Sequence, residues 1–149
     1  MYIKQLSIFL ENRAGRLGDV LTVLKNNEIN IVSASLADTS EFGLLRLLVN
    51  DTAKAKSVLK QAGFTAKDHD IIALVIPHKI GSLVEITKLI DKAGINIEYM
   101  YGLSTGIQGA SIAIKTSDLP GTVKALEPLN PKYYTEKEIS EVGENSAVQ

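Results

Sequence analysis

The 149-residue sequence contains no cysteine. This absence excludes disulfides, thiolate nucleophiles and cysteine-based zinc or iron–sulfur sites, and it fits a reducing compartment. The formal net charge is −1, so there is no broad basic field to attract nucleic acid or anionic lipid. No apolar run approaches membrane-spanning length, and residues 1–5 lack the apolar core of a signal peptide. We therefore expect a cytoplasmic protein with no nucleic-acid or membrane partner.

Signatures of catalysis are missing as well. The sequence has no nucleophile and base in a recognisable local pattern, no Walker-type phosphate loop and no dinucleotide fingerprint. Asp68-His69-Asp70 could suggest a metal site, but strand alternation would send His69 to the face opposite the two aspartates. RNA-recognition domains of the ferredoxin-like fold stack bases on aromatic residues of their central strands. The corresponding predicted strands here, residues 44–49 and 110–115, contain no aromatic residue. We expect no enzyme, no metal and no cofactor.

What the sequence does contain is a repeat. In each copy an apolar strand runs into a polar turn, a glycine, an amphipathic helix, and an asparagine between two isoleucines. Five pairs are identical at a separation of 66 positions: Gly15/Gly81, Leu17/Leu83, Ile29/Ile95, Asn30/Asn96 and Ile31/Ile97. Beyond the hairpin turn that follows the second strand of each copy, the separation between equivalent residues should grow by one, because the second hairpin turn contains one extra residue. Pairing Leu45 with Ile112 keeps apolar residues on one face, whereas constant spacing would set Arg46 against Ile112.

Each copy has the pattern strand, helix, strand, strand, helix, strand. The predicted strands cover residues 3–10, 29–37, 42–49, 64–69, 70–76, 95–103, 108–116 and 132–135. Helices are predicted after the turn at 12–15, after Asn50 or Asp51, over 82–93, and after Asp118. This order predicts an α+β fold of two ferredoxin-like βαββαβ units packed side by side, each an antiparallel sheet with helices on one face.

We assign the first domain to residues 1–69 and the second to residues 70–135, with a helical turn or two and a loose tail over 136–149. Helices cover only one face of such a sheet, and the opposite face would carry the apolar residues Phe9, Ala73 and Val75. We expect this bare face to pack on another copy of the chain. The alternative is ordinary scattered apolar surface.

The polar turns predict a small-molecule site. Free N–H groups at a helix start can bind a carboxylate, and an asparagine can hold an amine or a polar tail. The alternative is that the glycine only makes a turn and that the asparagine only bonds nearby backbone. The first candidate site comprises Leu10, Asn12, Arg13, Ala14, Gly15, Arg16, Leu17, Asn30 and Ile31. The second comprises His78, Ile80, Gly81, Ser82, Leu83, Asn96, Ile97 and Tyr99.

Both halves resemble ACT domains, the ferredoxin-like modules that bind amino acids and regulate metabolic enzymes. Residues 11–17, followed by Asn30, are similar to the serine-binding regulatory domain of phosphoglycerate dehydrogenases. The resemblance implies that Asn12 and Asn30 hold the ligand. Leu10 stands where that domain has a histidine, which argues against serine itself. In the second half His78 replaces the turn asparagine, so the two pockets should differ and the first should be the better one.

Residues 94–101 also resemble a group of stand-alone tandem ACT proteins. That resemblance implies a non-catalytic regulatory protein. A free amino acid would bind at a seam between two ACT domains joined through their second strands, and binding would allosterically control a metabolic enzyme. The implied partners are the amino acid, a second copy of the chain and the enzyme. The alternative is a ligand-free regulatory or structural subunit that docks on an enzyme, as small subunits of acetohydroxyacid synthases do.

Overall fold

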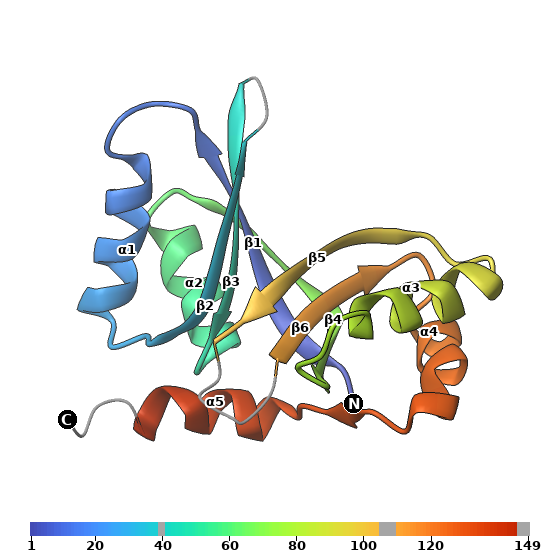
Figure 1. Ribbon diagram of the computed structural model, residues 1–149. Helices are drawn as coiled ribbons and strands as arrows, with labels where there is room; N and C mark the ends of the chain where they lie inside the picture. The colour runs from blue at the N-terminus through green and yellow to red at the C-terminus, as the bar shows by residue number, and fades with distance from the viewer. Residues whose placement is uncertain (39–40, 105–109, 146–149) are drawn as a thin grey trace. The chain divides into compact units, whose positions relative to one another are not determined.

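The structure is a computed structural model that describes residues 1–38, 41–104 and 110–145 (Figure 1). The chain forms two compact units. The first unit contains Lys4–His69 together with the C-terminal segment from Glu136, and the second contains Asp70–Thr135 with Met1–Ile3. In the described part of the chain, no helix is long and apolar enough to cross a membrane.

The first unit is an antiparallel sheet covered on one face by two helices (Figure 1). Its elements are β1 (Ile3–Glu11), α1 (Arg16–Asn26), β2 (Ile31–Asp38), β3 (Phe42–Val49), α2 (Thr52–Gln61) and the start of β4 (Thr65–Ile76). The strand order is β2, β3, β1, β4. Its core joins alternate residues of β1, including Leu6 and Ile8, to the apolar stripe of α1 at Val20 and Leu24.

The second unit repeats this plan. Its elements are the rest of β4, α3 (Ser82–Lys92), β5 (Ile97–Leu103), β6 (Ala110–Thr116), α4 (Leu119–Leu126), the 3-10 turn η1 (Glu127–Leu129) and β7 (Lys132–Tyr133). The strand order is β4, β6, β5, and the short β7 also pairs with β4. Ile72, Leu74 and Ile76 of β4 pack with Ile86 and Ile90 of α3. The fold class is therefore α+β with two ferredoxin-like units, as predicted.

The strand registers confirm the extra residue predicted in the second half. Ile8 pairs with Leu45 in the first unit, and Leu74 pairs with Ile112 in the second. The β1 and β4 partners are 66 positions apart, while the β3 and β6 partners are 67 apart. A constant offset would have turned β6 over, because a one-residue slip moves every side chain to the other face. The hairpin tip predicted around Gly106 lies outside the described residues.

The prediction of separate strands over 64–69 and 70–76 is wrong. The structure has one twelve-residue strand, β4, and the boundary between the two units falls inside it. The physical reason is that no glycine, proline or turn pair interrupts Thr65–Ile76, so the extended backbone continues. Within this strand, residues Ile72–Ile76 pair with β6 of the second unit.

The C-terminal segment forms a longer helix than the one or two turns predicted from sequence. Helix α5 runs from Glu136 to Asn145 and lies against β2 and β3 of the first unit. Ile139 is only 1% exposed, and the Ser140 hydroxyl donates to the Asn50 carbonyl over 3.1 Å. The Lys4 amide donates to the Glu136 carboxylate. Helix α5 is thus a structural part of the first unit. The prediction of a loose tail after residue 142 is wrong for residues 143–145, because they continue α5; residues 146–149 lie outside the described residues.

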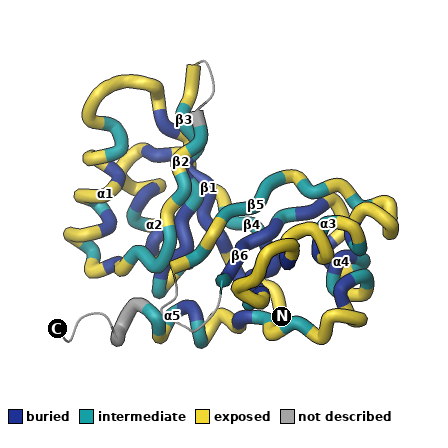
Figure 2. The backbone as a smooth tube through the Cα atoms, viewed as in Figure 1, coloured by how far each residue is buried: buried dark blue, intermediate teal, exposed yellow. Residues whose placement is uncertain are grey.

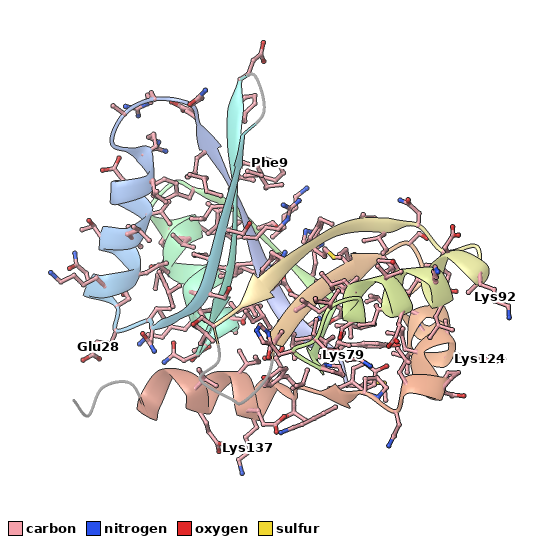
Figure 3. All side chains as sticks on the ribbon, in the orientation of Figure 1. Phe9, Glu28, Lys79, Lys92, Lys124 and Lys137 are labelled. Atoms are coloured by element: carbon pink, nitrogen blue, oxygen red, sulfur yellow. The ribbon has the colours of Figure 1, made fainter. Side chains whose placement is uncertain are left out.

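The sheet face opposite the helices is only partly bare. Phe9 is 45% exposed and points away from α1 and α2 (Figure 3). Ala73, in contrast, is fully buried, and Val75 is half-buried. The Tyr134 amide donates to the Ala73 carbonyl, and the Tyr134 hydroxyl lies 2.7 Å from the Ser111 hydroxyl, so this tyrosine covers that part of the face. The prediction of a bare face at Ala73 is therefore wrong.

Two glycines are required by the backbone at the start of α1 and α3. Gly15 and Gly81 have φ values of +89° and +91°, in the left-handed region that L side chains avoid. Added Cβ atoms would meet nothing within 4 Å, so the cost of a side chain there is conformational.

We expect Gly15→Ala to lower the free energy of unfolding by about 1–2 kcal/mol because of this strain. The matched control is Gly18→Ala, which lies within α1 and also has open space around its Cβ position. Gly18→Ala should raise the free energy of unfolding by about 0.5–1 kcal/mol, because alanine favours helix. Urea unfolding followed by circular dichroism measures both values. Two shifts of the same sign would contradict the left-handed assignment.

Candidate functional site

The turn between β4 and α3 borders a hollow of about 470 Å³. Its walls come from Ile76, Pro77, His78, Lys79, Ile80, Gly81, Ser82, Leu83, Val84 and Ala110. Gly81 is the N-cap residue of α3 and, within the described chain, no side chain caps this helix. Because the first N–H groups of a helix lack intrahelical acceptors and lie at the positive end of its dipole, the hollow offers donors for an anion.

Ser82 is the unusual residue of this site. It is 4% exposed, and its hydroxyl is buried without a hydrogen-bond partner among the described residues. It lines the large hollow and also an adjoining hollow of about 80 Å³ that Glu85 and Ile86 share. A buried hydroxyl without a partner costs about 1–3 kcal/mol. A ligand oxygen bound here would supply the missing partner after a rotation of the serine side chain.

His78 and Lys79 form the polar rim of the hollow. Both are exposed, as is most of the turn that carries them (Figures 2 and 3). The Lys79 ammonium lies 3.9 Å from the Glu85 carboxylate, on the first turns of α3. Such an exposed pair is weak, so Lys79 can turn toward an incoming anion at little cost. The rim therefore adds positive charge to the donors of the helix start.

The equivalent turn before α1 is held differently. Arg13 donates to the Glu11 carboxylate over 2.8 Å, and this hydrogen bond lowers the pKa of Glu11 below its ordinary value. Arg16 lies 3.4 Å from Asp19, and its guanidinium lies 4.4 Å from the centre of the Phe64 ring. The Arg16 Nε atom is buried with no hydrogen-bond partner in the described part of the chain. The guanidinium groups of Arg13 and Arg16 are therefore mainly engaged with side chains of the first unit.

The structure places Asn12 and Asn30 of the same unit far apart. Asn12 follows Glu11, which pairs with Phe42 at one end of β3, whereas Ile31, next to Asn30, pairs with Val49 at the other end. At about 3.3 Å per residue, these ends of β3 lie roughly 20–25 Å apart. A single free amino acid cannot touch both asparagines of one unit.

Both repeated asparagines have a structural role through their backbones. The Asn30 amide donates to Asn50 Oδ1 over 3.0 Å, and the Asn50 amide donates to the Asn30 carbonyl over 3.1 Å. The Asn96 amide donates to Ser117 Oγ over 3.2 Å, and the Ser117 amide returns a bond to the Asn96 carbonyl over 3.0 Å. These paired bonds tie the start of β2 or β5 to the residue after its partner strand. The repeat at these positions therefore has a folding explanation.

Of the other predicted residues, Leu10 is a core residue, whereas Ile31, Ile97 and Tyr99 belong to edge strands. The side chain of Leu10 belongs to the core and is 3% exposed, so it offers no contact to a ligand. Ile31 and Ile97 begin β2 and β5, each of which is an edge strand in its own unit. Tyr99 stacks on Tyr101 with 6.5 Å between ring centres, so both tyrosines share one face of β5.

The candidate site residues predicted from sequence do not include five residues of the hollow: Ile76, Pro77, Lys79, Val84 and Ala110. The sequence does indicate that Lys79 can attract an anion beside the turn, as its first-half counterpart Arg13 can. Ala110 could not be found this way, since it reaches the site through strand pairing with Ile76. Among the described residues, no three histidine or acidic side chains gather to hold a metal ion.

Comparison with known proteins agrees with this architecture. A family model described as an ACT domain pair matches residues 1–142. The solved structure of protein BT0572 from Bacteroides thetaiotaomicron is 31% identical, has a TM-score of 0.86, and the match covers 95% of this chain and 97% of that one.

Two more distant structures share the fold. The ligand-free regulatory subunit of aspartate kinase from Thermus thermophilus is 14% identical with a TM-score of 0.60, covering 85% of this chain and 90% of that one. The corresponding subunit from Thermus flavus is 14% identical with a TM-score of 0.60, covering 84% and 90%. Among curated proteins, none matches the chain.

Proposed function

The chain belongs to the ACT domain pair family, and from this premise we propose that it is a non-catalytic regulatory protein that binds a free amino acid and thereby controls a metabolic enzyme. The observation that carries the proposal is the hollow before α3, where a helix N-terminus meets the buried, unpartnered hydroxyl of Ser82. The absence of cysteine supports a cytoplasmic setting.

The groups around Ser82 suit the two charges of an amino acid. In our proposal the carboxylate accepts from the first N–H groups of α3 and from the Ser82 hydroxyl, with Lys79 nearby. The ammonium pairs with Glu85, which lies one helical turn after Ser82 on the same side of α3 and lines the adjoining hollow. The site thus favours a zwitterion over a simple anion.

The separation of Asn12 from Asn30 bears on assembly. A ligand that uses Asn12 must draw its further contacts from elsewhere than Asn30 of the same unit, and a second copy of the chain can provide them. We propose a homodimer on this basis. A ligand that prefers one packing of the dimer would shift it toward that packing, which is the coupling that allosteric control needs.

The test is a thermal-shift panel of the twenty amino acids with wild-type protein and Leu83→Glu. Ligand at 100 times its Kd stabilises the folded state by about 2.7 kcal/mol. Leu83→Glu places a carboxylate in the hollow, so the affinity should fall by at least about tenfold, or about 1.4 kcal/mol. Folding should not suffer, because an acidic side chain in the first turn of a helix is favourable.

Leu21→Glu is the matched control. Leu21 is 38% exposed on α1, close to the 43% of Leu83, and lies outside the hollow. This variant should respond to amino acids as the wild type does. The proposal fails if no amino acid shifts the melting temperature at millimolar concentration, or if Leu83→Glu responds undiminished.

A second candidate function is supported by exposed aromatic residues. Phe9 is 45% exposed and Phe42 is 49% exposed. They lie on the same sheet face, because Phe9 pairs with Leu44 and Phe42 is two residues before Leu44. This patch favours a subunit that docks on an enzyme without binding a ligand. This candidate would be favoured if no amino acid shifted the melting temperature and if Phe9→Ser lost its association with the enzyme.

A further inference from the structure

We infer that the hollow before α3 selects amino acids with aliphatic side chains, which pack against Ile80, Leu83 and Val84. The inference rests on the proposed function, because it names the class of amino acid bound at the same site. It assigns the carboxylate to the helix start and Ser82, and it assigns specificity to the three aliphatic residues.

The three residues form a cluster of solvent-exposed apolar side chains. Ile80 is fully exposed at 104%, Val84 is 51% exposed and Leu83 is 43% exposed. Single exposed apolar residues are common on protein surfaces. Here three occur within five positions, and all three line one hollow at the start of α3. A bound aliphatic side chain would bury part of each, which the hydrophobic effect favours.

The first half of the repeat shows that the fold does not require Ile80 or Val84. The counterpart of Ile80 is Ala14, and the counterpart of Val84 is Gly18. Ser82 corresponds to Arg16, whose guanidinium lies against Phe64. Two similar turns therefore differ in chemistry. The turn before α3 has gained branched aliphatic side chains and has a neutral hydroxyl where the first turn has a cation.

The floor and size of the hollow agree with an aliphatic ligand. Ile76, Pro77 and Ala110 complete the apolar lining, and the volume of about 470 Å³ is within the range of small-molecule sites. A serine hydroxyl or an aspartate carboxylate placed against Ile80, Leu83 and Val84 would lose water without gaining a hydrogen-bond partner from these side chains. Such uncompensated burial of polar groups is what lets an apolar site reject them.

The experiment measures Kd by calorimetry on the full chain. The probes are L-leucine, L-isoleucine, L-valine, L-serine and L-aspartate, with 4-methylpentanoate lacking the amine and 3-methylbutylamine lacking the carboxylate. We expect the three aliphatic amino acids to bind at least tenfold more tightly than serine or aspartate. Both truncated probes should bind more weakly than leucine, because each lacks one of the two charges.

Ile80→Ser tests the contact directly. It should weaken leucine binding about fivefold and leave the melting temperature without ligand unchanged, since Ile80 is fully exposed. Leu21→Ser, at an exposed apolar position of α1 outside both candidate sites, should leave the leucine Kd unchanged. An unaltered leucine Kd in Ile80→Ser would overturn the inference.

The outcomes also separate this inference from the function on which it rests. If serine or aspartate binds as tightly as leucine at this hollow, the aliphatic class is wrong while the amino-acid sensor stands. If no amino acid binds at all, the proposed function fails first. If the hollow binds no amino acid and Ile80→Ser disrupts self-association in sedimentation, the cluster is a contact between copies, and the inference is overturned.

Discussion

Ile139→Ala is expected to lower the free energy of unfolding by about 2–5 kcal/mol, the range for truncating a buried isoleucine to alanine. Ile139 is 1% exposed on α5, and this helix lies against β2 and β3 of the first unit. The cost combines lost apolar burial with the cavity left behind. Such a loss is a large fraction of the stability of an ordinary domain.

Chemical denaturation followed by circular dichroism measures this effect. Glu141→Ala is the control, because Glu141 is exposed on the same helix and its substitution should change the free energy by less than about 0.5 kcal/mol. Hydrogen exchange should further locate the destabilisation of Ile139→Ala in β2 and β3. If Ile139→Ala behaves like Glu141→Ala, then α5 does not pack on the first unit in solution.

Ser82→Ala and Ser111→Ala are expected to change stability in opposite directions. The two serines are almost equally buried, at 4% and 5% exposed. The Ser82 hydroxyl has no partner in the described structure, so its removal relieves a desolvation penalty and should stabilise the protein by about 1 kcal/mol. The Ser111 hydroxyl lies 2.7 Å from the Tyr134 hydroxyl, so Ser111→Ala removes a hydrogen bond between two buried side chains and should cost about 0.5–1.5 kcal/mol.

The stability gained on amino-acid binding distinguishes the roles of Ser82 and Ser111. Ser82→Ala should be more stable without ligand and yet gain less stability from a bound amino acid than the wild type. This combination is expected where a residue is kept for binding at the expense of stability. Ser111→Ala should retain a normal ligand response. A destabilised Ser82→Ala with unchanged affinity would show that the hydroxyl serves the fold and not a ligand.

Much of the fold could be predicted because its signals are local. The prediction of Asp118 as a helix cap is confirmed by its carboxylate, which accepts from the Gly121 amide over 2.9 Å. Asp51, one of the two residues predicted as the cap of α2, likewise accepts from the Lys54 amide over 3.0 Å. A helix cap needs only a side-chain oxygen and a backbone amide two or three residues further along the chain. A few neighbouring residues therefore suffice to identify it from sequence.

The candidate site could be predicted only in part. The repeat pointed to the turn residues His78 to Leu83, which do line a hollow. The same repeat also highlighted Asn30 and Asn96, whose backbones serve strand ends, and it ranked the first turn above the second. Sequence spacing measures distance along the chain, and it gives neither the burial of a hydroxyl such as that of Ser82 nor the length of sheet between Asn12 and Asn30.

The sequence alone predicts the two βαββαβ repeats, their registers and the glycines at the helix starts, since periodicity, turn chemistry and backbone conformation depend on near neighbours. The tertiary structure was needed to show that β4 pairs with both β1 and β6, that α5 joins the first unit, and that Tyr134 covers Ala73. It also decided that aliphatic residues surround a helix N-terminus at the second turn. These features arise from contacts between distant segments, whose stability depends on the surface buried when the whole chain folds.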